Sequence, residues 1–420
     1  MLFPVIKSLF LANLSQIYEH YKHLALRQKI TFGFYLLGPI FMLIERSPGD
    51  AWLSLCGIIF LGHCITSRNW CWLKTGWVKF TFLFWAVCII SALLSELPLY
   101  SLGEAIAWFR FPLFAFASCF YFCKSREIFY AMAIAIFIGL VLMTGILIAE
   151  ILIVGTQGGR LSWPYGDLTP GNYLAKACLP IFCVLVALAV ANKGRLSTTA
   201  AIISFITISV SVFAGERVNF IIRACGGMLA GLSWKPKLVP YCILIGLELA
   251  AVATIFLGNG TLASRFGRDF INQLPIHNDS PYLRVWRGGI IAFQEKPVLG
   301  IGPDVYRKTC SSLTEGLSNV DCHTHPHNYY IQLAGETGLI GLITGCLMLG
   351  SMLTKCFSYR RVDNDNVFTA IAYVIPLAMF FPLQSTGDFF GQWNNLFMWS
   401  AVAFALASGN LLPKRSIKSN

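Results

Sequence analysis

Residues 127–154, EIFYAMAIAIFIGLVLMTGILIAEILIV, form an apolar run that is long enough to cross a bilayer as one helix. A hydrocarbon core about 30 Å thick needs roughly 20 apolar residues in an α-helix. Further windows of this kind lie at 30–46, 50–67, 77–97, 104–123, 171–191, 197–214, 216–233, 238–258, 328–354, 366–386 and 391–411. Such unbroken runs differ from the alternating pattern of a β-barrel. The sequence therefore predicts an all-α polytopic membrane protein with about 12 transmembrane helices.

The composition agrees with a membrane protein. Of the 420 residues, 56% are apolar and 12% are charged, and the mean hydropathy is +0.64. This leaves too little polar surface to coat a soluble globule. The formal charge of +12 does not indicate nucleic-acid binding, because the basic residues are scattered between apolar windows. The fourteen cysteines form no CxxC pair of the metal-binding type, and most lie in apolar windows as small hydrophobes.

The distribution of Lys and Arg predicts the orientation in the membrane. Alternate loops carry basic residues, namely Arg68, Lys74 and Lys79; Lys124 and Arg126; Lys193 and Arg195; Lys235 and Lys237; Lys355, Arg360 and Arg361; and Lys414, Arg415 and Lys418. The opposite short loops hold only Arg46, Arg160 and Arg217. The positive-inside bias therefore places both termini in the cytoplasm.

This orientation divides the chain into three segments. Residues 1–258 are expected to hold helices 1–9, residues 259–327 to form a large external loop with short helices, and residues 328–420 to hold helices 10–12 and a cytoplasmic tail. Residues 1–28 show no cleavable signal peptide and suggest a short interfacial helix or, alternatively, a disordered tail.

Two external segments have a distinctive composition. Residues 156–171 are rich in Gly and Pro and contain Trp163, Tyr165 and Asp167, which suits either a sugar-stacking loop or an ordinary interfacial aromatic belt. Residues 282–294 predict an amphipathic helix that ends at Lys296-Pro297. We expect this helix to lie along the membrane surface as a lid.

Three arginines in or near the external segments are candidates for binding a phosphate. Arg217 lies where two apolar windows almost meet, so it should sit at the external surface and either bind an oxyanion or pair with Glu216. Arg284 and Arg287 are three residues apart and share one face of a helix. They would either stabilise a leaving pyrophosphate or form a solvated cationic face.

Three histidines precede the tenth apolar window. His323, His325 and His327 alternate, so in an extended segment they point to the same side. A metal site with Asp321 is one interpretation, although the spacing matches no zinc framework. A general base is the favoured one: a histidine beside Asn328 at the entrance of a helix fits this role, since the unperturbed pKa of histidine, about 6.5, suits it to taking a proton near neutral pH. The remaining alternative is a histidine that only caps the helix.

The motifs in this part of the chain resemble those of a known family. Arg284 is followed by Lys296-Pro297-Val298-Leu299-Gly300-Ile301-Gly302, by His327-Asn328 and, nine residues later, by Gly338-Leu339-Ile340-Gly341-Leu342. This pattern resembles the signature of the O-antigen ligase and polymerase superfamily. The resemblance implies a GT-C-like glycosyltransferase on the periplasmic face of the inner membrane.

The resemblance also implies a reaction and its residues. An O-antigen glycan would pass from undecaprenyl diphosphate to a sugar hydroxyl of lipid A-core, with inversion and with no metal, nucleotide or other cofactor. His327 would be the general base, and Arg217 and Arg284 would hold the diphosphate. The further candidates for substrate binding are Arg265, Arg287, His325 and Asn328. The expected partners are the lipid-linked glycan, lipid A-core and membrane lipid, with no nucleic acid.

Other functions stay open at this point. Leu342 and Ile343 stand where ligases often have threonines after the glycine pair, which leaves room for an O-antigen polymerase or a protein O-oligosaccharyltransferase. A lipid-linked glycan transporter is disfavoured, because the charges gather at the external mouth rather than along the spans.

A disulfide is predicted in the large external loop. Cys310 and Cys322 flank the polar segment SSLTEGLSNVD and would lie in an oxidising compartment. The alternative is two free thiols in a mobile loop.

Overall fold

The computed structural model describes residues 12–156, 160–167, 169–191, 194–275 and 280–413. These residues form helices and turns, with no β-strand element among them. Within the predicted N-terminal interfacial segment, α2 (Ala12–His23) is helical. Residues 1–11, Lys193 and the basic residues Lys414, Arg415 and Lys418 lie outside the described part of the chain.

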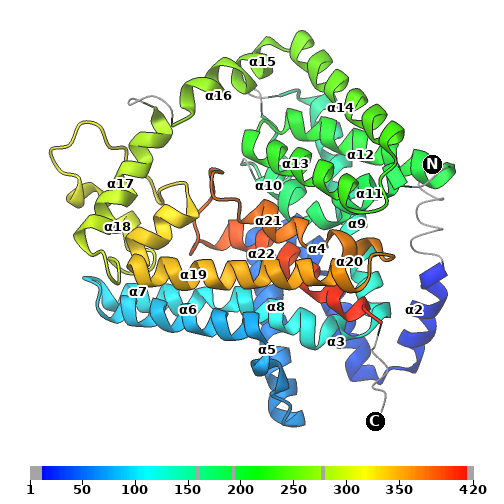
Figure 1. The fold of residues 1–420 in the computed structure, drawn as a ribbon, viewed down its shortest axis with the longest axis horizontal. Coiled ribbons are helices and arrows are strands. Elements are labelled where there is room, and N and C mark those ends of the chain that lie inside the picture. Colours follow the sequence, from blue (N-terminus) through cyan, green and yellow to red (C-terminus); the bar gives the residue numbers. More distant parts are fainter. Residues whose placement is uncertain (1–11, 157–159, 168, 192–193, 276–279, 414–420) are drawn as a thin grey trace.

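The first group of helices supplies α5 and α8, which pack against the C-terminal helix α22 (Gln392–Ala407). It comprises α3 (Leu26–Leu36), α4 (Gly38–Ile44), α5 (Arg46–Ser67), η2 (Cys71–Lys74), α6 (Gly76–Leu93), α7 (Pro98–Trp108), α8 (Arg110–Phe120), η3 (Phe122–Lys124) and α9 (Arg126–Ile153). Helix α8 lies against α5 and α22, and α6 runs along α19 in the lower half of the ribbon view (Figure 1).

The second group lies in the green part of the ribbon (Figure 1). It comprises α10 (Pro170–Asn172), the π-helical turn η4 (Tyr173–Ala177), α11 (Leu179–Ala191), α12 (Arg195–Phe213), α13 (Arg217–Ser233) and α14 (Leu238–Gly258). Helix α11 packs against both α12 and α13. From α14 the chain continues through α15 (Gly260–Phe266) and α16 (Arg268–Gln273) as an arch toward α17 (Figure 1).

The remaining helices complete the external segment and the C-terminal part. They are α17 (Pro281–Glu295), α18 (Tyr306–Leu313), α19 (Tyr329–Val362), α20 (Val367–Ile371), α21 (Val374–Met379), α22 (Gln392–Ala407) and η5 (Ser408–Leu411). Helix α17 forms where the amphipathic pattern predicts a helix, and its C-cap is Lys296. It packs on α18 and on the first part of α19.

The all-α membrane fold is confirmed, while the count of twelve spans stays a prediction. Seven helices in the described residues are long and apolar enough to cross a membrane, and the pair Pro170–Ala177 and Leu179–Ala191, bent by 60°, would make an eighth. Helices α13 and α22 have only 17 and 16 residues. Each of the twelve predicted windows nevertheless contains helix.

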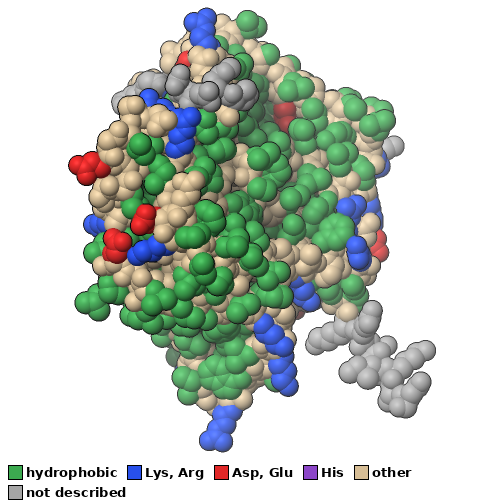
Figure 2. All heavy atoms as spheres, turned by 60° about the vertical axis from the view of Figure 1, so that its left-hand side comes forward, with side chains coloured by type: hydrophobic (Ala, Val, Ile, Leu, Met, Phe, Trp, Pro, Cys, Tyr) green, Lys and Arg blue, Asp and Glu red, His purple; other side chains and the backbone are tan. Residues whose placement is uncertain are grey.

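The surface has the character expected of a protein in lipid. Hydrophobic side chains cover most of the face shown in Figure 2. Large apolar side chains such as Leu152 and Leu257 are 79% and 90% exposed. Contiguous apolar surface of this extent is unusual in a soluble monomer and indicates contact with the bilayer.

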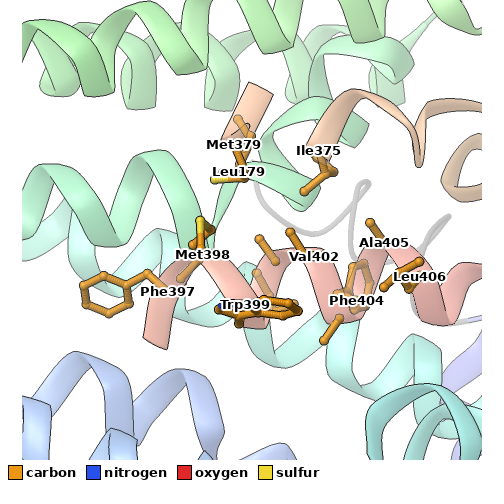
Figure 3. Close-up of a cluster of buried hydrophobic side chains, with 14 of the residues drawn as sticks. Leu179, Ile375, Met379, Phe397, Met398, Trp399, Val402, Phe404, Ala405 and Leu406 are labelled. Carbon is orange, nitrogen blue, oxygen red and sulfur yellow. The ribbon is translucent and has the colours of Figure 1, made fainter. Parts of the chain in front are cut away.

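Helix α22 is the centre of the core. Its residues from Leu396 to Leu406 are buried with the exception of Ser400, and Figure 3 shows Trp399 and Met398 among side chains from α11 and α21. Trp399 is fully buried and meets the ring of Trp108 from α7 with centroids 5.9 Å apart. This packing fixes the position of the polar N-terminal turn of α22.

Two glycines join the loop after α17 to α19. Gly338 interrupts α19 with φ +66°, and a Cβ there would lie 2.3 Å from the carbonyl oxygen of Val298. The N–H groups of Leu339 and Ile340 donate to the carbonyls of Pro297 and Val298 at 2.8 and 3.2 Å. Gly300, with φ +73°, approaches the backbone of Glu336 as closely. The glycines of the family-like motif therefore have a structural role, because only a residue without Cβ fits these approaches.

Candidate active site

A polar cavity of about 650 Å³ lies among the helix ends that the sequence predicts to be external. Six cationic side chains and two carboxylates line it, namely Arg46, Arg160, Lys176, Arg217, Arg265 and Arg307 with Glu216 and Asp388. The wall also contains His325 and His327 and the first residues of α22. A cavity with this excess of positive charge is suited to an anionic ligand.

The three arginines that break the positive-inside pattern all line this cavity. Arg46 begins α5, Arg160 follows α9, and Arg217 begins α13. Arg160 pairs with Glu216 at 3.4 Å. The sequence predicts a site for Arg217 alone and gives no role to the other two. Their position in loops that the positive-inside rule places outside was the signal that could have identified them.

Arg217 and Arg265 form the cationic centre of one wall. The guanidinium of Arg217 donates to the side chain of Gln273 and, at 3.3 Å, to the carbonyl of Arg265. The Nε of Arg265 donates to the carbonyl of Gly215 at 2.8 Å. Burial, and then the positive charges of Arg160 and Arg217, lower the pKa of Arg265. Arg217 does not take Glu216 as an ion-pair partner, since that carboxylate binds Arg160.

The three histidine rings cluster as the alternating pattern predicts. The ring centroids of His325 and His327 are 4.3 Å apart, and those of His323 and His327 are 5.3 Å apart. His325 and His327 line the cavity, whereas His323 does not. No group of three or more His, Cys, Asp or Glu side chains in the described residues is placed to hold a metal ion.

The hydrogen bonds of His325 define its tautomer. Its Nε2 lies 3.2 Å from the carbonyl oxygen of Thr386, so Nε2 carries the proton and donates. Its Nδ1 then accepts from the hydroxyl of Thr324 at 3.0 Å. Burial, and then the neighbouring ring of His327, lower the pKa of His325 to about 4.

His327 has an unusual backbone and a lowered pKa. Its φ is +52°, a left-handed conformation that places the residue just before the first turn of α19. Burial, and then the charge of His323, lower the pKa of the His327 imidazole. Both cavity histidines are therefore neutral at pH 7 and able to accept a proton.

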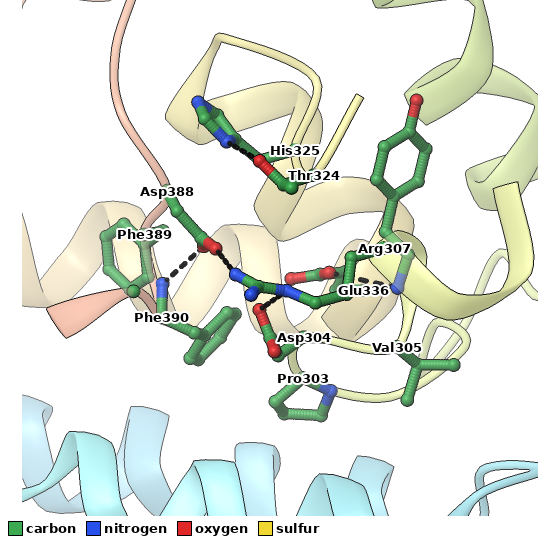
Figure 4. A network of polar contacts seen from close by, with 12 residues as sticks. Pro303, Asp304, Val305, Arg307, Thr324, His325, Glu336, Asp388, Phe389 and Phe390 are labelled. Carbon is green, nitrogen blue, oxygen red and sulfur yellow. Dashed lines mark hydrogen bonds and ion pairs between the residues drawn. The ribbon is translucent and has the colours of Figure 1, made fainter. Parts of the chain in front are cut away.

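Arg307 connects the histidine wall to a buried acidic group. It lies between Asp304, at 2.9 Å, and Asp388, and Figure 4 shows the three side chains beneath His325. Gln332 of α19 donates to Asp388 at 2.7 Å and to Glu336 at 3.0 Å. Burial, and then the charge of Asp388, raise the pKa of Asp304 to about 7. Sequence reasoning missed this network, although Asp388 lies in the gap at 387–390 between two apolar windows, at an end that the predicted topology makes external.

Three predicted site residues lie outside the lining of the cavity. Arg284 pairs with Asp321 at 2.7 Å, and Arg287 donates to the carbonyl of Asn319 at 3.3 Å. Asn328 is buried and caps α19, where its Oδ1 accepts from the N–H groups of Tyr330 and Ile331 at 3.0 and 3.2 Å. The cavity therefore brings together Arg217, Arg265, His325 and His327 from the predicted set.

Comparison with known families now adds to this geometry. Residues 177–345 match the family described as O-Antigen ligase. This central segment of the chain is therefore similar to the O-antigen ligase family. The matched segment includes Arg217, Arg265, Arg284 and His327 together with both glycines of the α19 contact. No curated protein matches the chain in a sequence comparison.

The predicted disulfide is present. Cys310 of α18 is bonded to Cys322, and their Cα atoms are 5.8 Å apart. The N–H of Asp321 also donates to the carbonyl of Arg284 at 3.3 Å. The bond therefore fixes the start of the histidine segment to α17 and α18.

An apolar groove of about 390 Å³ adjoins the cavity. It shares Val218, Tyr282 and Ser385 with the cavity wall. The rest of its lining is almost entirely hydrophobic, with Ile221 and Leu229 of α13, Phe270 of α16 and Phe381 after α21. The cationic cavity and the apolar groove are therefore continuous at these shared residues.

Proposed function

We propose that this protein transfers an O-antigen glycan from undecaprenyl diphosphate to a sugar hydroxyl of lipid A-core on the periplasmic face of the inner membrane. The match of residues 177–345 to the O-antigen ligase family supports a glycosyltransferase of the O-antigen ligase and polymerase type. The observation that carries the proposal is the continuity of an apolar groove with a cavity that contains arginines and neutral histidines. A lipid-linked anionic donor requires both surfaces.

The donor is assigned to the side of the cavity that meets the groove. The polyprenyl chain lies along α13 and Phe270, where apolar side chains replace lipid contacts. Arg217 and Arg265 bind the diphosphate, because guanidinium groups donate pairs of hydrogen bonds to phosphate oxygens. Arg284 is the further proposed ligand, and it reaches the diphosphate only after its guanidinium separates from Asp321.

Catalysis is assigned to the histidine wall. The acceptor hydroxyl gives its proton to the His327 ring while its oxygen attacks the anomeric carbon. The bond from that carbon to the diphosphate oxygen breaks, and the leaving diphosphate takes the electron pair beside Arg217 and Arg265. Direct displacement inverts the anomeric configuration. His325, held by Thr324 and Thr386, fixes the neighbouring part of the wall.

The nearest alternative is an O-antigen polymerase of the same superfamily. A deletion strain distinguishes the two by lipopolysaccharide gel electrophoresis. Loss of a ligase leaves full-length polymer on its lipid carrier and no O-antigen on lipid A-core. Loss of a polymerase instead caps lipid A-core with a single repeat unit, and that pattern would overturn the proposal. Complementation with the wild-type gene is the control.

A further inference from the structure

The cavity has a second cationic region that the donor assignment does not use. Arg46, Lys176, Trp393 and Asn394 line the cavity, and none of them lines the apolar groove. The residues shared with the groove lie on α13, on α17 and just after α21. The cavity thus has a wall that contacts the lipid-facing groove and another that does not.

Lys176 is a buried cation without an acidic partner. It is 9% exposed, and its Nζ donates to the amide oxygens of Asn172, at 2.7 Å, and Asn394. No ion pair joins Lys176 to a carboxylate of the described residues: Glu216 acts on it only at longer range and pairs with Arg160, and Asp388 pairs with Arg307. An ammonium group has three donors, so one stays available in the cavity wall. A buried unpaired charge is unfavourable, and an anionic ligand would compensate it.

An irregular turn of the backbone sets the direction of the Lys176 side chain. Lys176 lies on the π-helical turn η4, at the 60° break before α11. A π-turn inserts an extra residue into a helix, and such turns occur often at functional sites. In a regular α-helix from α10 to α11, without the extra residue of the π-turn, the residues of this turn would take other angular positions around the helix axis. The side chain of Lys176 would then point in a different direction.

Arg46 and Trp393 add a second cation and an aromatic surface. The guanidinium of Arg46 lies 5.3 Å from the centre of the Trp393 ring and pairs with Asp167. The indole N–H of Trp393 donates to the hydroxyl of Thr169 at 2.5 Å, which fixes the plane of the ring. The negative face of an indole attracts polarised C–H bonds, such as those on one face of a sugar ring.

The N-terminus of α22 contributes to the same wall. Its N-cap is Gly391, which has no side chain to satisfy the first N–H groups of the helix. Gly391, Gln392, Trp393 and Asn394 all line the cavity. The positive end of a helix of 16 residues therefore lies beside Lys176 and Arg46, where it favours a negative charge.

We infer that Lys176, Arg46 and Trp393 form a subsite for a sugar that carries a phosphate or carboxylate group. The assignment of this sugar to the acceptor rests on the proposed function, in which the donor lipid enters through the groove. The anionic group binds Lys176 and Arg46, and the ring packs on Trp393. The acceptor hydroxyl is then held in the cavity that also contains His327.

Binding of small probes tests the subsite without any need for transfer activity. Glucose 6-phosphate, glucuronate and glucose are titrated into the purified protein by calorimetry. We expect the two anionic sugars to bind about tenfold more tightly than glucose. Lys176→Gln and Arg46→Gln should each remove most of this preference. Lys235→Gln, at an exposed ion pair with Asp365 away from the cavity, should leave it unchanged.

Equal affinity for charged and neutral sugars, or an unchanged preference in both cavity variants, would overturn the subsite. Melting temperatures identify any variant that fails to fold, and the exposed position of Arg46 makes its variant the safer one. Steady-state kinetics then identify the source of the sugar. A KM raised about tenfold for the acceptor alone supports the acceptor assignment. A rise for the lipid-linked donor alone would overturn it, and retained probe binding without any transfer would refute the proposed function instead.

Discussion

The backbone N–H of Thr386 donates a 2.9 Å hydrogen bond to the carbonyl oxygen of His327. The carbonyl of Thr386 in turn accepts from Nε2 of His325. One residue of the segment between α21 and α22 therefore holds both cavity histidines, and it fixes the left-handed backbone of His327. The position of the proposed base depends on this contact between two segments that are far apart in the sequence.

We expect His327→Ala to reduce glycan transfer by about two to four orders of magnitude, because the acceptor hydroxyl loses its general base. His327→Asn distinguishes the loss of the imidazole ring from backbone strain at φ +52°, since Asn tolerates a positive φ better than Ala. Both variants should be inactive, and the Asn variant should be the more stable. Transfer is measured with purified protein, with His323→Ala as the milder control. Near-normal transfer by a folded His327→Ala protein would exclude the role.

Acid should destabilise the protein through His325. Its pKa is about 4 in the folded state, whereas an exposed histidine titrates near 6.5. Between these values the unfolded chain binds a proton that the folded chain does not, so this contribution to stability falls as the pH drops from 7 to 4. Asp304 acts in the opposite direction, because its raised pKa stabilises the folded state below pH 7.

Comparison of the wild type with His325→Gln isolates the contribution of His325 to the pH dependence of stability. We expect the melting temperature of the wild type to fall more between pH 7 and pH 5 than that of His325→Gln, in which Asp304 is unchanged. The measurement is thermal unfolding in detergent at fixed ionic strength. Identical pH dependence in both proteins would contradict a neutral, buried His325.

Arg217→Lys and Arg265→Lys should each lower transfer at least about tenfold, although the charge is kept. Lysine cannot form the paired hydrogen bonds of a guanidinium with a phosphate. Arg195→Lys is the matched control, since Arg195 is exposed at the start of α12 and outside the cavity. Full activity of both cavity variants would show that these arginines have only a topological role.

Hydropathy was sufficient to predict the helices, but it did not predict how they pack against one another. Each apolar window became helix because in lipid the backbone must satisfy its own hydrogen bonds. The breaks in the windows were not predictable in this way. The π-turn at Lys176 and the interruption of α19 at Gly338 depend on neighbouring segments, namely Asn394 for the lysine and Val298 for the glycine.

The site was predictable where its residues are close in sequence. The alternation of His323, His325 and His327 brought their rings together as expected. Arg307 reaches the cavity only through the packing of distant segments, and no local pattern encodes that. The burial of Arg223 in α13 was also not predictable locally, because its Nη1 donates to Thr207 and Ser211 of α12, and Arg223 does not line the cavity.

Removal of the disulfide should loosen the histidine segment. Cys310→Ser with Cys322→Ser opens a short ring whose closure stabilises the fold by about 3 kcal/mol in the chain-entropy model. We expect a lower melting temperature and faster proteolysis in this loop, with transfer reduced because Asp321 and Arg284 lose their fixed positions. Cys71→Ser, at an exposed free thiol, is the control. Full labelling of both loop thiols in the unreduced wild type would contradict the bond.

Gly338 should be the least replaceable residue of α19. Gly338→Ala places a methyl group 2.3 Å from the carbonyl oxygen of Val298 and forces φ +66° on a residue with Cβ. We expect a loss of about 2–5 kcal/mol in the free energy of unfolding. Gly350→Ala is the matched control, because it lies in the same helix with no atom within 4 Å of the added Cβ. That variant should be neutral or more stable by up to about 1 kcal/mol. Equal melting temperatures for the two variants would show that the loop around Val298 yields, and that the glycine motif does not hold α17 and the histidine segment against α19.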